Sequence, residues 1–195
     1  MALPTYNKNN RRKSFQQLPK AAYVLKILGA KEEPNKNGSG SHLTIIFDIA
    51  EGEYAGIYNN QYESSTNEDK KWPNDATFRL NIPSDGCEEW IWTNWNSFFA
   101  DLEDSNNGFV FAGDIKSLKG KLIGGKMRIE QSTYNGQVYD HTRLYWTCVA
   151  DDVRNGKAGR LPNDKLIKAG SVPVSATAPD GMMSIPDGAE DEIPF

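Results

Sequence analysis

Basic and aromatic residues alternate along two segments that flank Asn135-Gly136. This pair is the dipeptide most typical of a two-residue hairpin turn, and the turn sets the register of the strands on either side. Flat rings can stack on nucleic-acid bases while cations bind phosphates, so such a face is suited to a single-stranded polyanion. One face of the predicted hairpin carries the opposed pairs Lys126 and Tyr145, Arg128 and Arg143, Glu130 and His141, and Ser132 and Tyr139.

The pair Arg128 and Arg143 is the most informative of these. Like charges directly opposite on a strand pair destabilise it by up to about 1 kcal/mol. A negative group is therefore expected over them, and a phosphate backbone would serve. Lys119 and Lys121 extend the positive track toward the start of the same strand. The alternative is an ordinary solvated face whose tyrosines, Tyr139 and Tyr145, pack across the strands.

The tryptophans divide into one candidate for stacking and several for packing. Trp72 follows Lys70 and Lys71 in a polar loop, so it is a candidate to stack on a base, and the two lysines are candidates to bind DNA beside it. The alternation of the strand places Trp146 on the core face of the predicted hairpin. Trp90, Trp92 and Trp95 are expected to lie on a helix and to be packing residues. The adjacent Gly124 and Gly125 predict a bulge or a barrel corner.

Few residues are placed for catalysis. His42 and His141 stand apart from any metal-ligand spacing or nucleophile motif, and Cys87 and Cys148 are too far apart to form a metal clip. We therefore expect no enzymatic activity, no metal and no cofactor. A metal-dependent nuclease built on acids such as Glu51 and Glu53 is the least favoured alternative.

Charge is segregated along the chain, although the net charge is only −4. Residues 1–20 carry five bases and no acid, whereas residues 171–195 carry five acids and no base. This distribution predicts one polyanionic partner and one basic partner. The bases are Lys8, Arg11, Arg12, Lys13 and Lys20, and the acids are Asp180, Asp187, Glu190, Asp191 and Glu192.

The hydrophobic pattern predicts mostly strands. Strands are expected at 21–31 and 42–49, a third with a loop within 56–80, and a final pair around the Asn-Gly turn. One helix is expected from Asp85, whose spacing to Glu88 is that of a capping box, to about residue 107. Its expected buried stripe is Ile91, Trp95, Phe98, Phe99 and Leu102.

Three regions follow from this pattern: a flexible basic arm at 1–17, a folded domain at 18–155 and a disordered acidic tail at 156–195. The sequence contains no run of about 20 apolar residues and no secretion signal at its start. We expect a cytoplasmic protein with no membrane partner.

The last six residues resemble a known C-terminal motif. Glu190 to Phe195 resembles the acidic Asp-Ile-Pro-Phe ending of bacterial single-stranded DNA-binding proteins, with Glu192 in place of the Asp. The order of elements, with a helix before the last strand pair, resembles the five-stranded OB-fold, a Greek-key barrel, of that family. Residues 49–56 resemble a segment of small bacteriophage proteins, which favours a phage-encoded relative in a bacterial host.

The resemblance implies an all-β OB-fold with one helix that binds and protects single-stranded DNA during replication, recombination or repair. It also implies a tip that recruits replication or repair proteins, formed by Asp191, Glu192, Ile193, Pro194 and Phe195. Many relatives assemble into homo-oligomers. The alternative from another class is an adaptor of a phage replication complex, in which the tip binds a protein and the domain binds no single strand.

Overall fold

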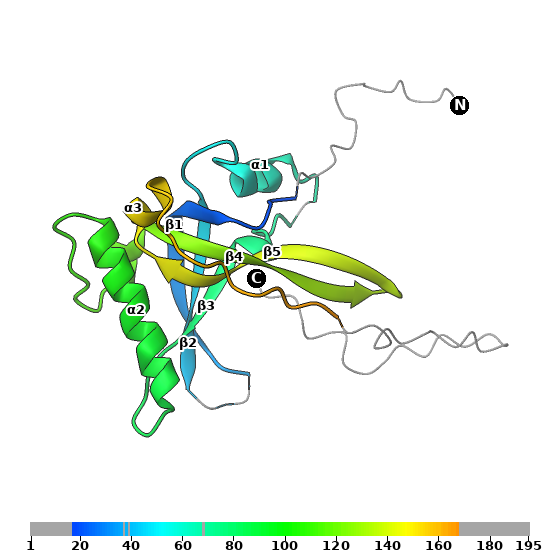
Figure 1. Cartoon of the computed structure of the whole chain (residues 1–195). Helices are drawn as coiled ribbons and strands as arrows, with labels where there is room; N and C mark the ends of the chain where they lie inside the picture. The colour runs from blue at the N-terminus through cyan, green and yellow to red at the C-terminus, as the bar shows by residue number, and fades with distance from the viewer. Residues whose placement is uncertain (1–16, 37, 39, 68, 168–195) are drawn as a thin grey trace, which may run out of the picture.

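The computed structural model describes residues 17–36, 38, 40–67 and 69–167. Its centre is one antiparallel sheet of five strands in the order β3-β2-β1-β4-β5 (Figure 1). The mostly-β architecture expected from the sequence is confirmed. The strands are β1 (Ala22–Pro34), β2 (Ser41–Ile49), β3 (Thr77–Asn81), β4 (Leu122–Tyr134) and β5 (Gln137–Cys148).

The expectation of a single helix is wrong, because the described residues form three α-helices and two short 3₁₀ turns. The helices are α1 (Ile57–Ser64), α2 (Glu89–Ser105) and α3 (Ala150–Arg154), and the turns are η2 (Asn74–Ala76) and η3 (Ile115–Leu118). Helix α1 depends on a tertiary contact. The buried carboxylate of Asp48 on β2 accepts hydrogen bonds from the backbone N–H groups of Tyr58 and Asn59 at 3.0 Å each, so it satisfies donors that the first helical turn leaves unpaired.

Helix α2 begins three residues later than the capping-box spacing predicts, because its N-cap is Glu88 and not Asp85. Gly86 lies between the two box residues with φ +77°, a left-handed conformation that a helix cannot continue through. Glu88 is the N-cap and makes no side-chain capping bond. The predicted stripe is confirmed at its C-terminal end, where Phe98, Phe99 and Leu102 are buried.

The core lies between the sheet and α2. The alternating row predicted on β2 is confirmed, since Leu43, Ile45, Phe47 and Ile49 are all buried. The same cluster includes Leu25 and Ile27 of β1, Met127 of β4, Leu144 of β5 and Leu102 of α2.

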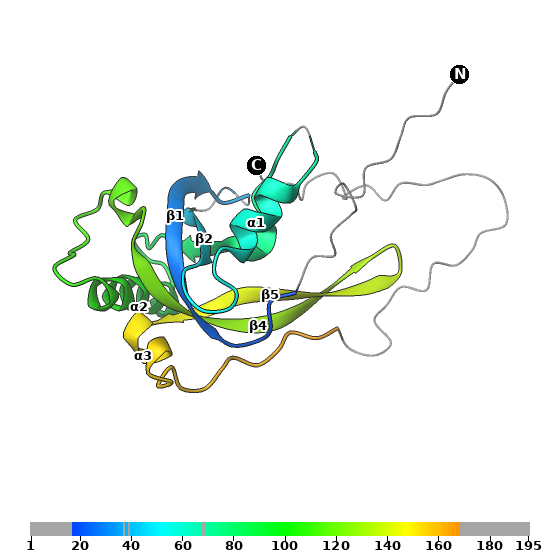
Figure 2. The same ribbon diagram turned by 90° about the horizontal axis from the view of Figure 1, so that it is seen from above.

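Strands β4 and β5 form a long hairpin that projects beyond the rest of the sheet (Figure 2). The predicted register is confirmed from Tyr134 opposite Gln137 to Met127 opposite Leu144. A bulge follows, so that Lys126 pairs with Trp146 and not with Tyr145. The bulge shifts the alternation by one residue. Trp146 consequently faces solvent, which corrects its predicted place in the core.

Gly124 and Gly125 make the close approach beside this bulge possible. A Cβ on Gly125 would lie 2.4 Å from Cδ1 of Leu25, and one on Gly124 would lie 2.8 Å from the carbonyl oxygen of Cys148. Both distances are shorter than any van der Waals contact. The two glycines therefore mark a crowded bend of β4 next to a bulge, as the sequence predicts.

Residues 162–167, here called the strap, run along the free edge of β4 (Figure 2). Lys165 donates its N–H to the carbonyl of Ile129 at 2.8 Å, and its carbonyl accepts a hydrogen bond from the N–H of Gln131 at 2.9 Å. Asp164 accepts a hydrogen bond from the N–H of Ile129 and pairs with Lys20, and these contacts lower the pKa of its carboxyl, the bond from Lys20 most. The boundary predicted for the disordered tail is therefore too early, because 156–167 include this ordered segment.

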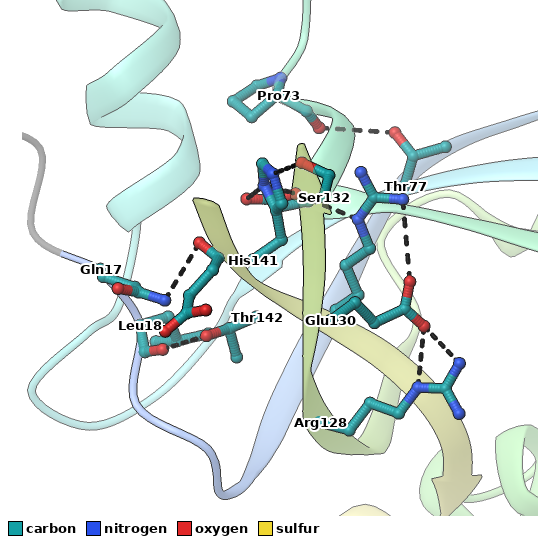
Figure 3. Close-up of polar contacts among 12 residues, drawn as sticks. Gln17, Leu18, Pro73, Thr77, Arg128, Glu130, Ser132, His141 and Thr142 are labelled. Carbon is teal, nitrogen blue, oxygen red and sulfur yellow. Dashed lines mark hydrogen bonds and ion pairs between the residues drawn. The ribbon is translucent and has the colours of Figure 1, made fainter. Parts of the chain in front are cut away.

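The segment before β1 is also attached to the hairpin. Thr142 of β5 donates its hydroxyl to the carbonyl of Leu18, and Gln17 reaches the carbonyl of Asp140 (Figure 3). The basic arm, apart from Gln17, and the tip Asp191–Phe195 lie outside the described residues. Among the helices described, none is long and apolar enough to cross a membrane.

Candidate nucleic-acid interface

A cleft of about 860 Å³ lies where β3, β5 and α2 meet. Strand β3 contributes five consecutive residues to its wall, and β5 contributes five from its bulged half. One face of α2 forms a further wall, lined by Trp90, Ile91, Asn94, Ser97 and Phe98. Because the strand order puts β3 and β5 at opposite ends of the sheet, the cleft is the gap left by the curled sheet.

The cleft combines positive charge with aromatic rings. Its charged lining residues are four bases, Lys36, Arg79, Lys126 and Arg143, and one acid, Glu130. This gives a local charge of +3 in a chain whose net charge is −4. Its aromatic lining residues are Phe78, Trp90, Phe98, Tyr145 and Trp146.

The bulge in β5 explains why two neighbouring rings line the cleft together. In a regular strand, Tyr145 and Trp146 would point to opposite faces. Here both side chains are exposed, with ring centroids 4.9 Å apart and planes inclined at 48°. The guanidinium of Arg128 lies 3.7 Å from the ring centre of Tyr145, so the cation supports the ring from the β4 side.

Carboxylates of the protein itself lie against the opposed arginines, where the like-charge pair predicts a negative group. Glu130 accepts a hydrogen bond from Nε of Arg128 at 2.7 Å, and its other oxygen lies 4.0 Å from Nη1 of Arg143 (Figure 3). Asp75 of η2 lies 3.3 Å from Nε of Arg143 and 3.2 Å from Nδ1 of His141. The like-charge pair is thus compensated within the chain, and a bound phosphate is not required to explain it.

The same face continues along the hairpin beyond the cleft. Ser132 and His141 are hydrogen-bonded across the strands at 2.9 Å. Tyr139 and Tyr134 follow toward the turn, and both rings are exposed. The aromatic surface therefore extends from the cleft to the end of the hairpin.

Several predicted site residues lie elsewhere. Lys119 is exposed at the end of η3, and Lys121 lies 4.3 Å above the ring of Phe109, so neither lines the cleft. Lys70 is held by α1, where its Nζ donates to the carbonyl of Glu63 at 3.1 Å. Lys71 also lies outside the cleft lining.

Trp72 is part of the packed structure. Its ring packs against the core, and its indole N–H donates to the carbonyl of Ala76 at 3.3 Å. Trp72 lies in a loop, as predicted, but its packed ring is not a free platform for a base. Of the predicted residues, Lys126, Arg143 and Tyr145 line the cleft together, Arg128 supports one of its rings, and Tyr139 continues the same face.

The prediction that Trp90 and Trp92 are packing residues is wrong, because their side chains are 49% and 47% exposed. Only Trp95 of the three packs against the core. A helical projection could have found the exposure of Trp90, which lies about 80° from the nearest residue of the stripe of Phe98, Phe99 and Leu102. It would not have separated Trp92, which lies about 20° from Phe99. Lys36 and Arg79 were also missed, and no local signal places them beside the hairpin.

One carboxyl group behind the cleft has a shifted pKa. Burial raises the pKa of Asp101 on α2, while a hydrogen bond from the hydroxyl of Thr147 at 2.6 Å opposes the shift. Thr147 itself lines the cleft, so this bond ties the β5 wall to α2. Among the described residues, no group of three or more His, Cys, Asp or Glu side chains is arranged to hold a metal ion. Comparisons with protein-family models and with curated proteins find no match to this chain.

Proposed function

We propose that this protein binds single-stranded DNA without strong sequence preference, with the strand lying in the cleft between β3, β5 and α2. The observation that carries this proposal is the gathering of four bases and five aromatic rings around one cleft of an acidic protein. Cations there would bind phosphates, and rings would stack on bases at about 1–3 kcal/mol per base.

The connectivity supports an OB-fold as the basis of this site. Strand β1 pairs with both β2 and β4, β2 pairs with β3, and α2 lies between β3 and β4. An OB-fold is a partly open five-stranded barrel whose nucleic-acid site involves the face of its second and third strands and the loop between its last two. The cleft on β3 and the exposed hairpin lie at the corresponding places.

The exposed rings favour a single strand over a duplex. Bases inside a duplex are stacked on each other and offer no free face to a side chain, whereas bases of a single strand do. Trp90, Tyr145 and Trp146 all reach the cleft, so a strand lying in it could use several stacking positions.

The acidic tip Asp191–Phe195 is proposed to recruit a replication or repair protein. A carboxylate next to terminal apolar side chains suits a small pocket with a basic rim. This part of the proposal depends on the sequence alone. It would remain, as an adaptor function, if the domain bound no DNA.

The test is fluorescence anisotropy of labelled single-stranded and duplex oligonucleotides of mixed sequence and equal length. The single strand should bind more tightly. A double variant, Lys126→Gln with Arg143→Gln, should weaken its binding and reduce the slope of log K against log salt by about 0.7 for each phosphate that is no longer neutralised. Glutamine is chosen because it removes the charge without placing a new acid beside Glu130.

The matched control is Lys26→Gln with Lys116→Gln, which removes the same charge from exposed positions outside the cleft. Its binding should stay close to that of the unmodified chain. Equal losses in the two double variants would mean that only overall charge matters and that the cleft is the wrong site. Preference for duplex, or no binding, would reject the proposed function.

A further inference from the structure

Helix α2 presents a separate, uncharged face to the cleft. The lining residues Trp90, Ile91, Asn94, Ser97 and Phe98 recur at the spacing of one helical face, and none of them is charged. The four bases all come from the β-strand walls and the β1–β2 loop. The bases that can bind phosphates thus all lie outside α2, whereas the α2 wall offers only uncharged side chains.

The side chains of this face are available to a ligand. Trp90 is half exposed, and its indole N–H donates to the carboxylate of Glu88, which holds the ring in one orientation. Asn94 and Ser97 are exposed one and two turns further along. Within the described part of the chain, no hydrogen bond takes up the side chain of Asn94 or Ser97. An asparagine amide can donate to and accept from the edge of a base.

We propose that α2 is the base-contacting wall of the cleft, with Trp90 stacking on a base and Asn94 and Ser97 hydrogen-bonding to base edges. This inference rests on the proposed binding of single-stranded DNA and specifies how that site distinguishes a nucleic acid from other polyanions. The strand then lies with bases toward α2 and phosphates toward Arg79, Lys126 and Arg143. Trp146 and Tyr145 contact bases from the opposite side.

The chain offers a close control for this proposal. Trp92 is on the same helix, two residues away, and is exposed to nearly the same extent, but it does not line the cleft. Trp92→Ala therefore changes the helix surface and its composition as Trp90→Ala does, without removing a ring from the proposed site. Trp90→Phe keeps a ring at the position and tests whether stacking, rather than the indole, is needed.

The experiment measures the affinity of the full chain for two labelled probes at one salt concentration. One probe is a mixed-sequence single strand of about 16 nucleotides, the upper end of the range for one OB-fold. The other is an oligomer of the same length whose nucleotides are all abasic. Thermal melting followed by circular dichroism checks that each variant is folded.

We expect Trp90→Ala to weaken binding of the normal strand by about 5- to 150-fold, which is the effect of losing one stacked base. Trp90→Phe should recover most of the loss, and Trp92→Ala should change the affinity by less than about 2-fold. The abasic probe should bind Trp90→Ala and the unmodified chain equally, because it has no base that could stack on Trp90. Asn94→Ala should alter the relative affinities for homopolymers of the four bases.

Two results would overturn the inference while leaving the proposed function intact. One is normal binding by Trp90→Ala. The other is an equal loss with both probes, which would show that Trp90 shapes the cleft without contacting a base. If the unmodified chain bound neither probe, the proposed function would fail and this inference with it.

Discussion

Glu130 lies between two arginines that the hairpin register forces to face each other. Its carboxylate compensates Arg128 and Arg143, and it is also the one acid among the residues that line the cleft. The same charge that stabilises the free protein therefore opposes a phosphate in the cleft. A strand that binds there has to compete with Glu130 for the arginines.

Replacing Glu130 by glutamine separates these two effects. Without DNA, Glu130→Gln should lower the free energy of unfolding by up to about 1 kcal/mol, because the arginines lose their carboxylate. With DNA, the affinity for the single strand should rise by about 1 kcal/mol, or roughly 5-fold, at low salt. Chemical denaturation and anisotropy measure the two quantities.

Glu53→Gln is the control, since it removes the same charge from an exposed position outside the cleft. It should leave both quantities nearly unchanged. A fall in DNA affinity for Glu130→Gln would show that Glu130 positions the arginines for DNA rather than competing with it.

At the scale of elements, the strap supports the edge of β4 that no other strand covers. Lys165→Pro removes the N–H that bonds to the carbonyl of Ile129, whereas Lys165→Ala keeps it. We expect the proline variant to speed hydrogen exchange of the Gln131 amide by about 5-fold or more, as for the loss of one hydrogen bond of about 1 kcal/mol. NMR-detected exchange measures it, and similar rates in the two variants would mean that the strap does not protect this edge.

Local signals in the sequence were sufficient to predict the strands β1 and β2 and most of the hairpin register, because a two-residue turn and an alternating row determine them. They failed where distant contacts decide the structure. Helix α1 depends on Asp48, ten residues before Tyr58, and the strap depends on an open edge of β4. The glycine pair indicates a bulge near Lys126, but alternation alone does not show which residue of β5 it shifts.

The candidate site shows the same division. Lys126, Arg143 and Tyr145 could be predicted because they belong to one hairpin whose turn is evident in the sequence. Arg79 and Trp90 come from β3 and α2, and only the curled sheet brings them to that hairpin. Trp72 was misassigned because a tryptophan beside lysines in a polar segment looks exposed, although its ring packs on the core.

For the whole molecule, the salt dependence of binding separates the cleft from the basic arm. The cleft supplies four bases, and residues 1–16 supply four more in Lys8, Arg11, Arg12 and Lys13. Lys20 is not counted with them because it pairs with Asp164. If each base contacts one phosphate of a single strand, log K falls with log salt at a slope of about −6 for the full chain and about −3 without residues 1–16.

Anisotropy titrations of the full chain and of a chain lacking residues 1–16, each at several salt concentrations, measure both slopes. Equal slopes would show that the arm makes no phosphate contact, and its charge would then need another partner. A slope near zero for the shortened chain would show that the cleft makes no phosphate contact. The predicted pair of slopes requires both parts to bind the same strand, because contacts to separate DNA molecules would not add in one binding constant.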